Sequence, residues 1–155
     1  MESPPRARTP QAVLFACGQN SVRSPMAEAL LRQMYPKALY VKSAGVKKGE
    51  VDPFVVAVMA ELGIDIGKHK PTTFDELDNW EGLNFDLIIS LSPEAHHKAL
   101  ELTRTMAVDV EYWPTHDPTT TEGNREQKLA AYREVCDGLA LRIRKRFARG
   151  GAANG

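Results

Sequence analysis

Two residues that can do chemistry together stand near the start of the chain, Cys17 and Arg23, with five residues between them. The apolar run "AVLFAC" ends at the cysteine and "SPMAEALLRQM" follows the arginine, which predicts a strand, a loop and a helix. Such a loop can curl so that its backbone N–H groups point inward and bind an anion, and the N-terminus of the next helix extends the site. The Arg23 guanidinium can hold two oxygens of a phosphate-like group, and the same positive field favours the thiolate of Cys17. The spacing therefore predicts a loop that binds an anion and activates a nucleophile.

A proton donor for a leaving group is offered by Asp117, which with Pro118 lies in "THDPTTTEG" after the fourth apolar run. An Asp-Pro pair is also common in turns and at helix caps, so the spacing alone leaves both interpretations open. His116 is a competing acid, although a solvated loop histidine is the simpler interpretation. The three threonines at 119–121 are interpreted as turn residues.

Apolar runs alternate with helical patterns four times along the chain. Strands are expected at 12–17, 38–45, 85–92 and 106–113. Helices are expected at 24–34, 53–62, 93–102 and 124–147, the first with Ser24 as its cap and Pro25 in its first turn. The alternation favours an α/β fold, a parallel sheet with helices on both faces. Ligands of such sheets bind beyond the carboxyl ends of the strands, which is where Cys17 stands.

The composition bounds the class of protein. We expect one domain at 11–148, between flexible tails at 1–10 and 149–155. Twenty basic residues balance twenty acidic ones, which argues against a nucleic-acid-binding protein, and the dense basic run at 142–149 suits a helix end. Two cysteines make no secreted disulfide framework, so a reducing, cytoplasmic setting is expected. No window is apolar enough for a membrane span, and no cluster of side chains suggests a metal site.

The run "VLFACGQNSVRSPMAEA" is similar to the low-molecular-weight protein tyrosine phosphatase family and its arsenate reductase relatives. Further segments keep the family's order: "KSAG" at 42–45, "LGIDIGKHKP" at 62–71, "FDLIIS" at 85–90 and the Asp-Pro pair. The resemblance covers most of residues 12–147. It implies a three-layer α/β fold, in which a four-stranded parallel sheet is flanked by helices and a phosphate-binding P-loop follows the first strand. It also implies a covalent cysteinyl-phosphate mechanism with no cofactor and no metal.

The resemblance assigns roles to particular residues of this chain. It implies that Cys17 is the nucleophile, Arg23 the anion-binding arginine and Asp117 the general acid. The remaining residues of the phosphate-binding loop are then Gly18, Gln19, Asn20, Ser21, Val22 and Ser24. Of these, Ser24 matches the residue that donates a hydrogen bond to the thiolate. Asn20 matches an asparagine that a serine and a histidine tie down in the family, and Ser43 and His69 occupy those positions.

The chain departs from the family pattern around the loop. Gln19 replaces a glycine, and a positive φ at that position costs a non-glycine residue about 1 kcal/mol, so we expect a slightly different loop shape. Val22 stands where many members carry a second, protective cysteine. The loops "VKKGEVDP" and "DPTTTEG" lack the aromatic residues that flank the pocket in phosphotyrosine-specific members. Lys47 and Lys48 instead put positive charge near the expected mouth, which favours a small or acidic phosphorylated substrate.

The cysteines also bear on the second activity of the family. The segment "SLSPEAHHKA" lacks the two cysteines through which thioredoxin-linked arsenate reductases pass a disulfide outward. Cys136 lies on the apolar stripe of the last helix, as a core residue does. An arsenate reductase of this sequence would need an external small thiol with a glutaredoxin-like partner.

Three hypotheses remain open at this point. The leading one is a cysteine-dependent phosphate monoester hydrolase that acts on a phosphorylated protein, above all on phosphotyrosine, or on a small aryl phosphate. The second is the arsenate reductase that uses an external thiol. The third is a non-catalytic phosphate-binding module. None of them calls for a nucleic acid or a membrane as partner.

Overall fold

A four-stranded parallel sheet forms the centre of the computed structural model, which describes residues 10–36 and 39–152. The strand order is β2 (Tyr40–Gly45), β1 (Ala12–Cys17), β3 (Leu87–Ser90) and β4 (Asp109–Tyr112). All three strand pairs are parallel, which confirms the predicted α/β fold. The later strands are shorter than predicted. At the start of β3 the reason is local, because the Asp86 carboxylate accepts the backbone N–H groups of Gln11 and Ala12.

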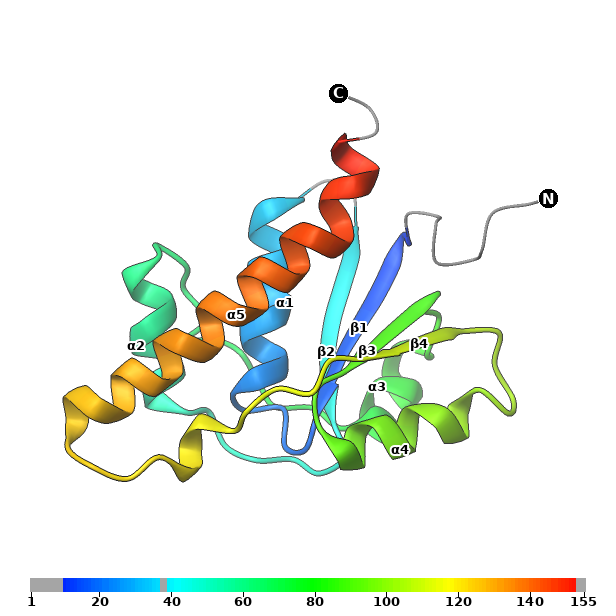
Figure 1. Ribbon diagram of the computed structural model, residues 1–155. Coiled ribbons are helices and arrows are strands. Elements are labelled where there is room, and N and C mark those ends of the chain that lie inside the picture. Colours follow the sequence, from blue (N-terminus) through cyan, green and yellow to red (C-terminus); the bar gives the residue numbers. More distant parts are fainter. Residues whose placement is uncertain (1–9, 37–38, 153–155) are drawn as a thin grey trace.

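Helices cover both faces of the sheet. Figure 1 shows α1 (Arg23–Met34), α2 (Pro53–Glu61) and α5 (Arg125–Ala152) on one side, with α3 (Phe74–Glu81) and α4 (Pro93–Leu102) on the other. Side chains of β1 alternate between the two faces. Val13, Phe15 and Cys17 belong to the core under α1, α2 and α5, and Leu14 and Ala16 belong to the core under α3 and α4. Both faces of β1 are thus buried, as the continuous apolar run predicts.

One helix, α3, is absent from the prediction. Its buried residues are only Phe74 and Leu77, which is too few for a helical periodicity to stand out. Its start carries a different signature: the Thr73 hydroxyl accepts the Glu76 N–H at 3.0 Å, and the Glu76 carboxylate accepts the Thr73 N–H at 3.2 Å. This is a capping box, so the motif T-x-x-E at 73–76 would have found the helix.

The C-terminal part of the chain differs from the prediction. The last helix, α5, begins at Arg125 and continues to Ala152, beyond Phe147 where the apolar stripe ends. Residues 149–152 are therefore helical, and 153–155 lie outside the described residues. The tail predicted at 1–10 also lies outside them, apart from Pro10. The flexibility expected for both tails stays a prediction. Among the residues described, no helix combines the length and the apolar character that a membrane crossing requires.

The strand order creates a crevice at the carboxyl edge of the sheet. The chain passes from β1 to β2 on one side and returns as β3 on the other, and in such sheets ligands bind where the order reverses. Cys17 is the last residue of β1, and Ser92, two residues after the end of β3, is the N-cap of α4. The segment that follows β4 runs towards the same edge (Figure 1), and Asp117 lies in this segment.

Candidate active site

The loop between β1 and α1, residues 17–23, surrounds a pocket at this edge. We call it the cysteine loop. The pocket has a volume of about 160 Å³. It is lined by Cys17, Gly18, Gln19, Ser21, Val22, Arg23, Glu94, Asp117 and Thr119. The structure thus brings the three predicted catalytic residues together, Cys17 and Arg23 from the cysteine loop and Asp117 from the segment after β4.

The backbone of the cysteine loop is oriented by its neighbours. Four consecutive carbonyl groups, of residues 17–20, are hydrogen-bonded outside the pocket. The donors are Val46 N to Cys17 O (3.2 Å), Lys47 N to Gly18 O (2.9 Å), Gly49 N to Gln19 O (2.9 Å) and His69 Nε2 to Asn20 O (3.0 Å). In a planar trans peptide the N–H points away from the C=O, so the N–H groups of residues 18–21 face the other side, where the pocket lies. Four N–H groups aimed at one space form an anion site.

Asn20 is the buried hub of the loop. It adopts a left-handed backbone conformation, φ 57°, which asparagine tolerates better than most residues. Its Oδ1 accepts the Thr72 N–H at 2.8 Å, and its Nδ2 donates to Ser24 Oγ and Ser43 Oγ, each at 2.9 Å. The side chain is fully buried and every polar atom of its amide has a partner. Ser43 thus contacts the side chain of Asn20, and His69 contacts its backbone carbonyl group.

The expectation for Gln19 is corrected by the same geometry. Asn20 is the one non-glycine residue of the described chain with a positive φ, so position 19 does not require a glycine. Space for the larger side chain comes from the facing loop. A Cβ on Gly49 would lie 2.9 Å from the Cβ of Gln19 and 2.8 Å from its Oε1. The bulk of Gln19 is therefore accommodated where the facing loop carries Gly49.

Ser24 was predicted to cap α1, but it does not. The helix begins at Arg23 behind Val22, which provides no side-chain cap, so the first N–H groups of α1 remain available at the pocket. The Ser24 hydroxyl instead lies 2.9 Å from Cys17 Sγ. Since it accepts a hydrogen from Asn20 Nδ2, its own hydrogen is free for the sulfur.

The hydrogen-bonded chain continues beyond Asn20 to a residue that the sequence did not single out, Glu28 on α1. The Ser43 hydroxyl donates to the Glu28 carboxylate, and Arg32 pairs with the other carboxylate oxygen. Asn20 Nδ2 therefore donates to both serines, which leaves the Ser43 hydrogen for Glu28 and the Ser24 hydrogen available to Cys17. The sequence signal that could have revealed this contact is an acidic residue in the helix five positions after Arg23.

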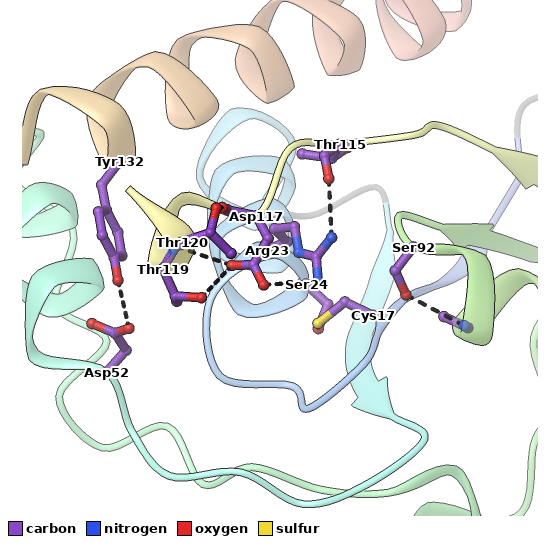
Figure 2. A network of polar contacts seen from close by, with 11 residues as sticks. Cys17, Arg23, Ser24, Asp52, Ser92, Thr115, Asp117, Thr119, Thr120 and Tyr132 are labelled. Carbon is purple, nitrogen blue, oxygen red and sulfur yellow. Dashed lines mark hydrogen bonds and ion pairs between the residues drawn. The ribbon is translucent and has the colours of Figure 1, made fainter. Parts of the chain in front are cut away.

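Arg23 and Asp117 face one another across the pocket (Figure 2). Arg23 Nη1 donates to the Thr115 carbonyl at 3.0 Å, and Nη2 lies 3.9 Å from Asp117 Oδ2. Asp117 Oδ1 accepts from the N–H and the hydroxyl of Thr119, at 3.0 and 2.7 Å. The turn role considered for Asp117 is thus real, since it caps the short 3₁₀ helix η2 (Pro118–Thr120), but it occupies one oxygen only. Thr119, interpreted as a turn residue, lines the pocket as well.

The charges around the pocket differ from the expectation. Lys48 forms an ion pair with Glu76, Nζ to Oε2 2.8 Å, and neither Lys47 nor Lys48 lines the pocket. A second carboxylate does, that of Glu94 in the first turn of α4. His116 lies instead in a separate groove against α5, next to Glu134, so it does not compete with Asp117. The site is therefore less positive than the sequence suggested.

Cys136 is a core residue, as expected. It is 2% exposed, and its Sγ lies 3.9 Å from Met59 Sδ between α5 and α2. Burial raises the pKa of its thiol to about 11, which keeps the sulfur protonated and unreactive near neutral pH. It lines no part of the Cys17 pocket, so the two cysteines of the chain lie at unrelated places.

A cysteine loop of this geometry, ahead of a helix in a parallel α/β sheet, defines a class of anion-binding nucleophilic sites. The family model of the low molecular weight phosphotyrosine protein phosphatases matches residues 12–149. This chain belongs to that family. An arsenate reductase of Bacillus licheniformis is 36% identical over 141 residues, which are 91% of this chain and 97% of that protein.

Solved structures from both branches of the family resemble this fold. A crystal structure of arsenate reductase from Archaeoglobus fulgidus has a TM-score of 0.66 and 30% identity, and the match covers 88% of this chain and 98% of that chain. A low molecular weight protein tyrosine phosphatase from T. tengcongensis has a TM-score of 0.69 and 25% identity over 87% of this chain and 96% of that one. The family thus includes relatives that are named arsenate reductases and relatives that are named tyrosine phosphatases. The residues of the pocket have to indicate which of the two activities suits this chain.

Proposed function

We propose that this protein is a cysteine-dependent phosphate monoester hydrolase that works through a cysteinyl-phosphate intermediate. In the proposed reaction Cys17 attacks phosphorus while the N–H groups of the cysteine loop and Arg23 bind the equatorial oxygens. Asp117 gives a proton to the leaving oxygen as the P–O bond breaks. Asp117, now ionised, then takes a proton from the water that hydrolyses the S–P bond.

The observation that carries this proposal is that the two carboxylate oxygens of Asp117 have different surroundings. One oxygen is bound by Thr119, while Oδ2 is turned to the pocket, 3.9 Å from Arg23. A carboxyl group held at the pocket with one oxygen unoccupied by protein donors suits proton transfer to a leaving group. Asn20 Nδ2 donates to Ser24 Oγ, and this leaves the Ser24 hydroxyl hydrogen available to the Cys17 sulfur that makes the first attack. Because Cys17 has to remain reduced, the reaction suits a reducing compartment such as the cytoplasm.

The test is the hydrolysis of phenyl phosphate by the purified protein, beside Cys17→Ser. We expect phosphate release that Cys17→Ser abolishes, and a rapidly quenched wild-type sample should contain phosphate bound to Cys17. The serine variant retains the size and hydrogen bonding of the side chain, so its inactivity reports on nucleophilicity. Turnover that survives in Cys17→Ser would reject the proposal.

A second candidate is favoured by one observation, the name of the Bacillus licheniformis relative. In an arsenate reductase, Cys17 forms an S–As bond while one As–O bond breaks and that oxygen leaves as water. An external thiol then attacks Cys17 Sγ, and the S–As bond breaks. Arsenic then takes the two electrons released as the mixed disulfide forms, and arsenite leaves. Cys136 cannot replace the external thiol, because it lies buried against Met59.

The two candidates differ in their need for a reductant. With arsenate and a glutaredoxin-coupled small thiol, the reductase predicts arsenite formation that depends on Cys17 and on the thiol. The hydrolase predicts phosphate release without any thiol beyond Cys17. Anion binding without either turnover would indicate a binding module. The ratio of the two kcat/KM values in the same preparation decides which reaction the pocket favours.

A further inference from the structure

Glu94 brings a second carboxylate to the pocket, which the family resemblance did not assign. It is the second residue of α4, which begins beside β1 because β3 pairs with β1. Its carboxylate lies against the cysteine loop: a Cβ on Gly18 would be 3.7 Å from Glu94 Cδ and 3.8 Å from both of its oxygens. The glycine at position 18 leaves that face of the loop open to Glu94.

The Glu94 carboxylate is held in its ionised form. Hydrogen bonds from the Ser92 hydroxyl and from its own backbone N–H lower the pKa of this carboxyl below its usual value. The nearby guanidinium of Arg23 acts in the same direction, against the opposing effects of burial and Asp117. The N-terminus of α4 also favours a negative charge here. Glu94 therefore presents a fixed negative charge next to the nucleophile.

The charges of the side chains that line the pocket affect which substrates it favours. The charged side chains that line the pocket are one cation, Arg23, and two carboxylates, Glu94 and Asp117, besides the thiol of Cys17. A phosphate monoester adds two negative charges. Even with Asp117 protonated as the acid and Arg23 paired with the phosphoryl group, Glu94 is left facing the leaving group without a cation. A positive charge on the leaving group removes this imbalance.

We propose that Glu94 is a specificity-determining residue that selects phosphate compounds whose leaving group carries a positive charge. The inference rests on the proposed hydrolase function and names its substrate class. The chemical step is unchanged: the S–P bond to Cys17 forms, the P–O bond breaks, and the leaving oxygen keeps the electron pair and takes the proton of Asp117. The cationic substituent keeps its charge throughout and lies near the Glu94 carboxylate.

The test compares three aryl phosphates that differ in the charge of the ring substituent: phenyl phosphate, 4-(trimethylammonio)phenyl phosphate and 4-carboxyphenyl phosphate. Each is measured with the wild type, with Glu94→Gln and with Glu101→Gln. Glu101 is an exposed glutamate at the other end of α4, so it controls for the loss of one negative charge from the same helix. Ratios of variant to wild type remove the different leaving-group reactivities of the three esters.

For Glu94→Gln we expect kcat/KM to fall about three- to tenfold for the cationic ester and to rise by a similar factor for the anionic one. The neutral ester should change less than about twofold, and Glu101→Gln should leave all three ratios near one. Equal changes for all three esters in Glu94→Gln would overturn the proposal, because they would indicate a general effect on the loop or on α4.

A binding measurement separates this proposal from the proposed function. Dissociation constants of 4-(trimethylammonio)benzylphosphonate and 4-carboxybenzylphosphonate report the charge preference without any turnover. If Cys17-dependent hydrolysis is absent but Glu94→Gln reverses the preference between the phosphonates, the hydrolase fails and the role of Glu94 stands. If hydrolysis is present and neither esters nor phosphonates respond to Glu94→Gln by charge, the role of Glu94 fails alone.

Discussion

Asp117 uses its two carboxylate oxygens differently, and this asymmetry can be tested at the level of one atom. In Asp117→Asn the amide oxygen can still accept from Thr119, so we expect the free energy of unfolding to change by less than about 0.5 kcal/mol. The proton donor is lost, so kcat should fall about a hundredfold or more with phenyl phosphate. The fall should be smaller with 4-nitrophenyl phosphate, whose leaving group needs no proton.

The two esters together test whether Asp117 donates a proton to the leaving group. An equal fall for both would mean that Asp117 positions Arg23 or the loop and gives no proton. Urea unfolding of the same preparations shows whether the cap has survived. An Asp117→Ala variant, which removes the cap as well, should be less stable than Asp117→Asn by about 1 kcal/mol.

Asn20 holds the cysteine loop with both ends of its amide, so a change of one atom should be costly. Asn20→Asp keeps the oxygen that accepts from Thr72 but removes both N–H donors to Ser24 and Ser43. We expect a loss of about 2 to 4 kcal/mol in the free energy of unfolding, because two buried hydrogen bonds are lost and a charge is buried.

The control for Asn20 is Asn79→Asp, the same change at an exposed position in α3. Chemical denaturation at neutral pH should place this control within about 0.5 kcal/mol of the wild type. A similar loss in both variants would show that the buried amide network adds nothing to stability.

At the scale of elements, the cysteine loop depends on how closely the end of β2 approaches it. A Cβ on Gly45 would lie 2.7 Å from Asn20 N, 2.7 Å from Lys47 O and 2.8 Å from Gln19 C, all backbone atoms that cannot move independently. Gly45→Ala should therefore displace the loop, with a loss of about 1 to 3 kcal/mol in stability and a large loss of turnover.

Gly138→Ala is the matched change in an open place. This glycine lies on an exposed position of α5 and a Cβ there meets nothing within 4 Å. Alanine favours the helix, so thermal unfolding should show a gain of about 0.5 to 1 kcal/mol with unchanged turnover. If Gly45→Ala behaved like Gly138→Ala, the close contact between β2 and the cysteine loop would not be needed for function.

At the scale of the whole molecule, buried Cys136 predicts how stability changes at alkaline pH. Its pKa is about 11 in the folded protein, against 9.0 for the free side chain. The contribution is present in full below pH 9 and is lost as pH rises towards 11, because the unfolded chain releases the proton first. From this residue alone we expect a fall of about 3 kcal/mol in the free energy of unfolding.

Cys136→Ala isolates this contribution. The variant should be less stable than the wild type at pH 8, since packing against Met59 is lost, but its stability should fall less steeply between pH 9 and 11. Urea denaturation across that range gives both curves. Parallel curves for wild type and variant would contradict the assignment of a raised pKa to the buried thiol.

Local sequence patterns predicted most of the strands and helices. They missed a helix with few buried residues and a hydrogen bond between residues that meet only in the folded chain. The apolar run at β1 and the stripe of α5 are long enough for burial to follow from the sequence. The helix α3 buries only two side chains, so periodicity missed it although its capping box is present. Ser24 was predicted as a cap from local preference, but its hydroxyl is drawn to Cys17 and Asn20 by contacts that form only in the folded chain.

From the amino-acid sequence alone it follows that Cys17 and Arg23 share a loop between a strand and a helix, since five intervening residues keep them together in any such fold. The parallel α/β class follows from the sequence as well. Only the tertiary structure decided which distant groups meet that loop: Asp117 with one oxygen turned to Arg23, Glu94 beside Gly18, and Gly49 making room for Gln19. The reason is that the strand order brings the ends of β1 and β3 together, and the order of strands follows from packing over the whole chain and not from any local spacing.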